Sequence, residues 1–344
     1  MEHEILKSHE LLDERGVLIE PGFTRGLLMD YDRKKIKAGA LRIKEWDYYL
    51  VTTNDFAIAL TIDDNSYMGL DSISLLNFKE GWEHTNSPMK FFTMGKRNFP
   101  KRSDVGDISV KEKGYEMSFR LEDGKRILSF SMDNFYDKKP IIGEIVLDNP
   151  KEDSMVICTP WKEKETAFYY NQKIIAMPAK GYAKFDGKTY TFNEGESFGL
   201  LDWGRGVWTY KNTWYWGAAQ GLVGQDRIGW NIGYGFGNTE NASENMLFVN
   251  GKAHKLDRLT FNIPLDEKGK EKYLEDWTFT SNDNRFEMKF HPIMDRASNT
   301  DFKVLGSDQH QVFGYFTGKV VTDEGRIIEV ENFLGFSEKV YNKW

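Results

Sequence analysis

The run Tyr115-Glu116-Met117-Ser118-Phe119-Arg120-Leu121 decides the fold, because apolar and polar residues alternate in it with a period of two. Asp123-Gly124 follows it, and then comes a second strand-like run, Ile127-Leu128-Ser129-Phe130-Ser131-Met132. An Asp-Gly dipeptide readily takes the positive φ angles that a two-residue hairpin turn requires. The sequence therefore predicts an antiparallel β-hairpin over these residues.

The same arrangement recurs along the chain. Asp186-Gly187 and Asn250-Gly251 each stand between two short runs of alternating residues. Aromatic residues make up 15% of the chain, and their flat rings pack well on the pleated surface of strands. We find no long, strongly amphipathic helical pattern. Hairpins at this density predict an all-β fold of antiparallel sheets or barrels with little helix.

The length of 344 residues suits two domains better than one β domain. A faint internal repeat supports this division. Trp46-Asp47-Tyr48-Tyr49 opens a series of strands in the first half, and Trp214-Tyr215-Trp216 opens one in the second. We expect two tandem antiparallel β-barrels, one over residues 1–200 and the other over residues 201–344.

Composition excludes several functional classes. The net charge of −7 and the lack of clustered Lys and Arg argue against a nucleic-acid partner. With Cys158 as its one cysteine and six histidines without ligand spacing, the chain is expected to bind no metal and no cofactor. No signal peptide and no apolar stretch of membrane-spanning length is found, so we expect a cytoplasmic protein. We expect it to be a monomer or a homodimer.

The most unusual segment is Asp202–Gly217, which holds six aromatic residues, three glycines and an Asp-Arg combination. Protonation of an apolar alkene needs one acid and a wall of π faces that stabilises the resulting cation. We expect Asp202 to be that acid and Arg205 to orient it. The residues expected to line the ligand site are Trp203, Trp208, Tyr210, Trp214, Trp216, Asn231, Trp46 and Tyr48.

Other interpretations of these residues remain open. Arg205 stacked on a tryptophan would fit a structural role, closing the end of a barrel, as well as it fits a catalytic role. The charged residues of the run Arg42–Asp47 fit the exposed face of an edge strand better than a polar binding site. Gly195–Gly199 matches the literal pattern of a serine nucleophile elbow around Ser197, although no helix follows it. Glu244 is expected to lie across a hairpin from His254 as a surface pair.

The whole chain resembles the bacterial domain-of-unknown-function family 2804. The resemblance rests on Arg42–Tyr49, Asp202–Trp208, Trp214–Trp216 and Gly335–Glu338. That family looks like a member of the calycin superfamily, and it is more distantly similar to the lipocalin-like hydroxyneurosporene synthase and tocopherol cyclase families. Their signature has Asn-Trp-Gly followed by Trp-x-Trp, whereas this chain has Asp202 in place of the Asn.

The resemblance implies two tandem lipocalin-like barrels that bind a hydrophobic small molecule of isoprenoid or lipid type. It also implies cofactor-independent hydration, isomerisation or cyclisation, the reactions of the distant relatives. A non-catalytic carrier or sensor of an apolar ligand is the alternative on the same fold. A serine hydrolase that uses Ser197 is a third interpretation.

Overall fold

The structure is a computed structural model that describes residues 2–302 and 305–343. Within these residues nearly all regular secondary structure is β-strand, and the rest is two short 3₁₀ helices, η1 (Arg33–Lys35) and η2 (Ala40–Arg42). The strands of the two large sheets pair antiparallel, while β1 (His9–Glu10) and β3 (Met29–Asp30) form a small parallel pair. The prediction of an all-β, lipocalin-like fold is confirmed. No helix in the described part is long and apolar enough to cross a membrane.

The first sheet has fourteen strands. Ten of them follow one another across the sheet in this order: β7 (Trp82–Asn86), β6 (Met68–Asn77), β5 (Phe56–Asp64), β4 (Ile43–Thr52), β16 (Phe198–Val207), β14 (Lys164–Phe185), β12 (Lys139–Asp148), β11 (Lys125–Tyr136), β10 (Tyr115–Glu122) and β9 (Ile108–Glu112). The other four pair at its sides: β2 (Gly22–Thr24), β8 (Met89–Phe91), β13 (Met155–Trp161) and β15 (Lys188–Phe192).

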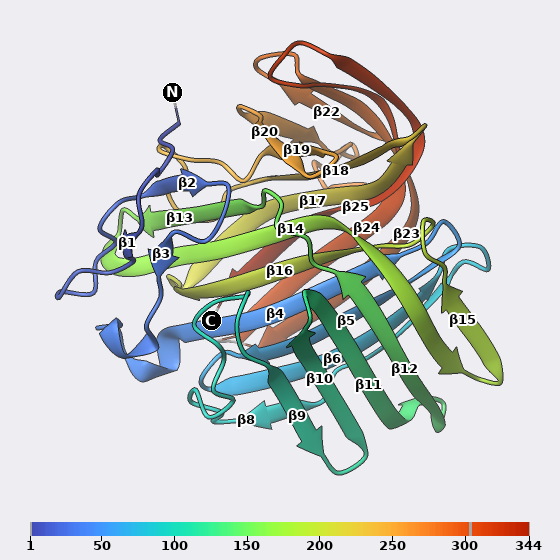
Figure 1. The fold of residues 1–344 in the computed structure, drawn as a ribbon, viewed down its shortest axis with the longest axis horizontal. Helices are drawn as coiled ribbons and strands as arrows, with labels where there is room; N and C mark the ends of the chain where they lie inside the picture. Colours follow the sequence, from blue (N-terminus) through green and yellow to red (C-terminus); the bar gives the residue numbers. More distant parts are fainter. Residues whose placement is uncertain (1, 303–304, 344) are drawn as a thin grey trace.

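The second sheet has nine strands, and Figure 1 shows it packed against the long curved strands of the first. Its order is β20 (Lys252–Lys255), β19 (Met246–Val249), β18 (Asp226–Tyr234), β17 (Lys211–Val223), β25 (Ile327–Lys343), β24 (Leu305–Val321), β23 (Phe286–Phe302), β22 (Trp277–Ser281) and β21 (Leu259–Asn262).

The predicted hairpin turns are present. Asp123 and Gly124 have φ values of 49° and 73°, and they join β10 to β11 in an antiparallel hairpin with Met117 opposite Phe130. Asp186 and Asn250 also take positive φ, each followed by a glycine that does the same. Local turn chemistry therefore fixes these hairpins, as the sequence indicated.

Strand β4 corrects one expectation. It pairs with β5 on one side and with β16 on the other, so it is a central strand of the first sheet. Lys44, Glu45 and Asp47 are all buried there. The prediction of an exposed edge strand over Arg42–Asp47 is therefore wrong.

The chain passes from the first sheet to the second between Val207 and Lys211. All pairing of β16 is with the first sheet, although residues 201–207 fall in the second of the two domains expected from the sequence. The two-domain division remains a proposal, and the sheets favour a boundary at residues 208–210.

Two apolar clusters fill the molecule. The second cluster lies inside the C-terminal sheet around Trp230 and Phe316. The first extends from the N-terminal sheet to Trp216, Phe313 and Phe336 of the second sheet. The two sheets therefore share one core. We call this shared region the junction: it lies between the face of β4, β14 and β16 that carries Tyr48 and Asp202 and the face of β17 and β25 that carries Trp216.

Candidate functional site

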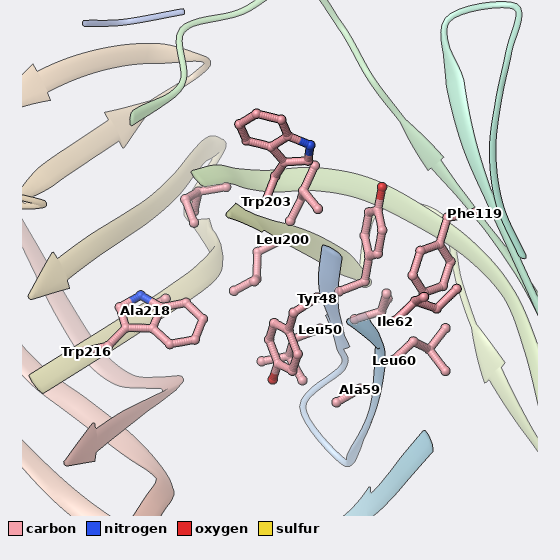
Figure 2. Close-up of a cluster of buried hydrophobic side chains, with 14 of the residues drawn as sticks. Tyr48, Leu50, Ala59, Leu60, Ile62, Phe119, Leu200, Trp203, Trp216 and Ala218 are labelled. Carbon is pink, nitrogen blue, oxygen red and sulfur yellow. The ribbon is translucent and has the colours of Figure 1, made fainter. Parts of the chain in front are cut away.

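Strand β16 divides the Asp-Trp-Gly-Arg motif between two faces. Because neighbouring side chains of a strand point to opposite sides, Asp202 faces the junction while Trp203 and Arg205 face the interior of the first sheet. Figure 2 shows Trp203 pointing away from the side on which Tyr48, Leu200 and Trp216 gather. The expected pairing of Arg205 with Asp202 is therefore not formed.

Arg205 has a different set of partners. Its Nη1 lies 3.0 Å from Oδ1 of Asp47 and donates to the backbone carbonyls of Trp46 and Gly204. Its guanidinium stacks on Trp203, with Cζ 4.1 Å from the ring centroid. Burial raises the pKa of Asp47, and the charge of Arg205 opposes that shift. These contacts support the structural interpretation of Trp203 and Arg205, and they place neither residue at the junction.

Asp202 is paired with a residue that sequence reasoning missed. Lys173 stands directly opposite it on β14, and Nζ lies 2.8 Å from Oδ1. Asn171 donates to the same oxygen at 2.6 Å. The Lys173 ammonium also lies 4.0 Å from the ring centroid of Trp216, which belongs to the second sheet. Asp202 thus stands in a buried ion pair that touches both sheets.

Glu338 on β25 is the second carboxyl group of the junction. Trp214 Nε1 donates to its Oε1 at 2.9 Å, and Gln311 Nε2 donates to its Oε2 at 3.1 Å. Burial raises the pKa of Glu338 to about 7, although Lys173 and the hydrogen bond from Trp214 act in the opposite direction. The cause is desolvation, which penalises the charged form.

Glu244 is the third carboxyl group, and it follows β18 in the chain. The Tyr169 hydroxyl donates a hydrogen bond to it. Burial raises the pKa of Glu244, and Lys173 again opposes the shift. The expected pairing of Glu244 with His254 is wrong, since His254 lies 3.5 Å from Asp323 instead. The Lys173 ammonium therefore acts on three buried carboxyl groups.

Asn231 and Tyr48 hold Trp216 in place. Trp216 Nε1 donates to Asn231 Oδ1 at 2.7 Å, and Asn231 Nδ2 donates to the backbone carbonyl of Glu244 at 2.9 Å. Tyr48 meets Trp216 edge to face, with ring centroids 6.0 Å apart, as Figure 2 shows. The structure thus brings together four of the residues that the sequence singled out, Asp202, Trp216, Asn231 and Tyr48.

More aromatic side chains pack at the junction near Trp216. Trp208 packs edge to face on Trp46, with ring centroids 5.4 Å apart, and on Trp214 at 6.1 Å. Trp46 in turn stacks on Tyr169, the partner of Glu244. Tyr210 is 44% exposed and stands outside this buried group. Four of the five tryptophans expected to line a site therefore lie at the junction, and Trp203 does not.

Several buried polar atoms of the junction have no hydrogen-bond partner within the described residues. They are the Tyr48 hydroxyl, Asn171 Oδ1, Trp208 Nε1 and Gln311 Oε1. Buried polar groups are nearly always paired, so unpaired atoms gathered in one place call for an explanation. Ser197 Oγ is also buried and unpaired, and no histidine bonds to it. That arrangement lacks the base that a serine nucleophile requires.

A groove of ≈ 600 Å³ opens at one end of the junction. Its lining comes from both sheets and includes Thr52, Phe198, Gln220 and Phe333. Gln220 Nε2 donates to the carbonyl of Phe198 at 2.9 Å, and Leu50, Leu200 and Ala218 lie on the same side as Tyr48 and Trp216 in Figure 2. The groove therefore lies next to the apolar part of the junction, where Leu50, Leu200 and Ala218 are buried. No metal-binding group of three or more His, Cys, Asp or Glu occurs in residues 2–302 and 305–343.

Comparison with known proteins gives a family match and structural neighbours. The family model described as "Domain of unknown function (DUF2804)" matches residues 2–344. No curated protein matches. The crystal structure of CghA with Sch210972 has 11% identity and a TM-score of 0.55, with 98% of this chain and 97% of that chain covered.

Two further solved structures are similar at lower scores. Kievitone hydratase from Nectria haematococca has 12% identity and a TM-score of 0.48, with 88% of each chain covered. A putative AttH from Nitrosomonas europaea has 10% identity and a TM-score of 0.47, with 90% of this chain and 96% of that chain covered. At 11% identity, the likeness to CghA with Sch210972 concerns the fold alone.

Proposed function

The chain belongs to the family described as domain of unknown function 2804, and from this premise we propose that it binds a hydrophobic small molecule at the junction and catalyses its hydration, isomerisation or cyclisation without a cofactor. The observation that carries the proposal is the group of three buried carboxyls, Asp202, Glu244 and Glu338, around the Lys173 ammonium. Carboxyls that are close together and desolvated cannot all ionise, so such a group retains a proton near neutral pH.

The contacts assign different tasks to these carboxyls. Asp202 Oδ1 accepts from both Lys173 and Asn171, so Asp202 is the one of the three carboxyls that stands in a direct ion pair. Glu338, with a pKa of about 7, is half protonated near neutral pH and suits a general acid. Sequence reasoning selected Asp202 for the acid. The structure supports Glu338 in that role and Asp202 as the anion that stabilises positive charge on the substrate.

The aromatic rings supply the rest of the chemistry. Protonation of a double bond leaves a cation, and the faces of tryptophan rings attract cations through their quadrupole. Trp216 already holds the Lys173 ammonium in this manner. A carbocation would be stabilised in the same way by tryptophan faces of the junction that the Lys173 ammonium does not occupy, and exclusion of bulk water would strengthen this interaction.

Native mass spectrometry of the freshly purified protein, followed by solvent extraction, tests this proposal. We expect a co-purified apolar molecule, and we expect it to be absent from Ala218→Phe, which fills the junction next to Trp216. Leu222→Phe is the matched control, because Leu222 lies on the same strand and is 48% exposed. Retention of the molecule by Ala218→Phe would contradict binding at the junction.

The extracted molecule then separates an enzyme from a carrier. Incubated with a candidate precursor, an enzyme gives a product with the mass of one added water, or an isomer of unchanged mass. Glu338→Gln should bind the molecule with unchanged affinity and lose turnover. If the protein is a carrier or sensor, the wild type and Glu338→Gln would both bind the molecule, and neither would convert it.

A further inference from the structure

The inference rests on the proposed function and concerns the part of the substrate that lies beside Glu338. Two of the unpaired atoms, the Tyr48 hydroxyl and Gln311 Oε1, belong to side chains that adjoin Glu338. The Tyr48 hydroxyl lies next to the Gln311 amide, but no hydrogen bond of good geometry joins them. Both residues are more than nine-tenths buried, at 8% and 1% exposure.

Their chemistry is complementary. The Tyr48 hydroxyl has a proton to donate, and burial raises its pKa to about 12, so it stays protonated. Gln311 Oε1 is an acceptor, since the amide already uses Nε2 to donate to Glu338. One donor and one acceptor are therefore left without partners at the same place. Each costs free energy while it is buried and unpaired.

We infer that the substrate carries a hydroxyl group, which accepts a hydrogen bond from Tyr48 and donates one to Gln311. A hydroxyl is a donor and an acceptor at once, so a single group pairs both atoms. A ketone would pair Tyr48 and leave Gln311 Oε1 unpaired. An anionic ligand would add a further negative charge beside Asp202, Glu244 and Glu338, whose crowding and burial already disfavour ionisation of the two glutamates.

The hydroxyl would also fix the geometry of proton transfer. Held by Tyr48 on β4 and Gln311 on β24, it would bridge the two sheets next to the Glu338 carboxyl. The unsaturated hydrocarbon body would then extend over Trp216 and toward Trp214. Substrates of this class are neutral unsaturated alcohols or phenols.

Two neutral probes of similar size test the inference at pH 6: 2-naphthol, which has the hydroxyl, and 2-methylnaphthalene, which lacks it. Dissociation constants from intrinsic probe fluorescence should show 2-naphthol bound at least about tenfold more tightly, which is about 1.4 kcal/mol shared by the two hydrogen bonds to its hydroxyl. Tyr48→Phe should lower this preference to about threefold or less, and Tyr48→Phe combined with Gln311→Leu should remove it. Tyr341→Phe, at an exposed tyrosine of β25, should keep the full preference.

The outcomes are distinguishable. Equal affinity for the two probes in the wild-type protein overturns the inference and leaves the proposed binding of apolar molecules intact. A preference that survives in the double variant also overturns it, because the hydroxyl would then bind elsewhere. Failure of both probes to bind overturns the inference together with the proposed function.

Discussion

Gln220 and Phe198 join the two sheets: Gln220 Nε2 on β17 donates to the Phe198 carbonyl on β16 at 2.9 Å. Gln220 Oε1 accepts from the backbone N–H of Ala176 at 3.0 Å, so one side chain pairs two buried backbone groups of the first sheet. Ala176 has a φ of 62° at an irregularity of β14, where ladder pairing is interrupted. Gln220 replaces the partners that the ladder does not provide there.

The first prediction follows from this contact. Gln220→Leu should lower the free energy of unfolding by about 2–4 kcal/mol, because two buried backbone groups lose their partners. Urea denaturation measures the change. Gln225→Leu is the control, since Gln225 is exposed in the turn after β17. An equal effect in the two variants would show that Gln220 does not connect the sheets in solution.

The second prediction concerns the Lys173–Asp202 pair. Lys173→Met leaves a buried carboxylate without its cation and should cost about 3–5 kcal/mol of unfolding free energy. The double variant Lys173→Met with Asp202→Asn should regain most of this loss, because the unpaired charge is gone. Denaturation in urea at pH 7 measures both.

The exposed pair Lys162–Glu240 provides the control, with both side chains 65% exposed. Lys162→Met should cost about 1 kcal/mol or less, as is typical of surface ion pairs. If Lys173→Met were equally mild, Asp202 would have to be neutral or hydrated, and its assigned role as an anion would fail.

The third prediction concerns pH. Burial raises the pKa of Glu338 to about 7, so in the folded protein this group binds its proton more tightly than in the unfolded chain. The unfolding free energy must then fall as pH rises from the ordinary carboxyl range through about 7. Glu338→Gln should remove this fall, which amounts to roughly 3 kcal/mol at most by the linkage relation.

Urea titrations at pH 5, 6, 7 and 8 give the profile, and the difference between the variant and the wild type isolates Glu338 from other groups. Glu331→Gln, at an exposed carboxyl of the same strand, is the control for the loss of one charge. A constant difference between wild type and Glu338→Gln over this range would contradict the assignment of Glu338 as the acid.

Sequence reasoning recovered the parts of this fold that short segments determine. The Asp-Gly and Asn-Gly turns and the alternation of Tyr115–Leu121 specify hairpins without any help from distant residues. The position of a strand within its sheet is set by distant pairing instead. The sequence of β4 therefore suggested an edge strand. In the structure β16, which lies far along the chain, pairs with β4 and makes it a central strand.

The residues of the candidate site could be anticipated only in part, for the same reason. Trp216, Asn231 and Asp202 come from neighbouring segments of unusual composition, which made them visible. Lys173, Glu244 and Glu338 reach the junction from β14, from the segment before β19 and from β25, so only tertiary pairing brings them together. A lysine placed between the aromatic run Phe168–Tyr170 and the apolar run Ile174–Met177 was the one local sign of a buried partner for Asp202.

The last prediction separates the two faces of β16. Arg205 donates to three backbone carbonyls and to Asp47 and stacks on the face of Trp203, and a lysine cannot reproduce this planar array of donors. Arg205→Lys should therefore cost about 2–4 kcal/mol of unfolding free energy, while the same change at Arg15, whose side chain is 72% exposed, should cost almost nothing. At a temperature where the variant stays folded, it should still bind the junction ligand with wild-type affinity, because Asp202 and its partners lie on the opposite face. Loss of ligand affinity without loss of stability would show that Arg205 contributes to ligand binding. It would contradict the structural role that its contacts support.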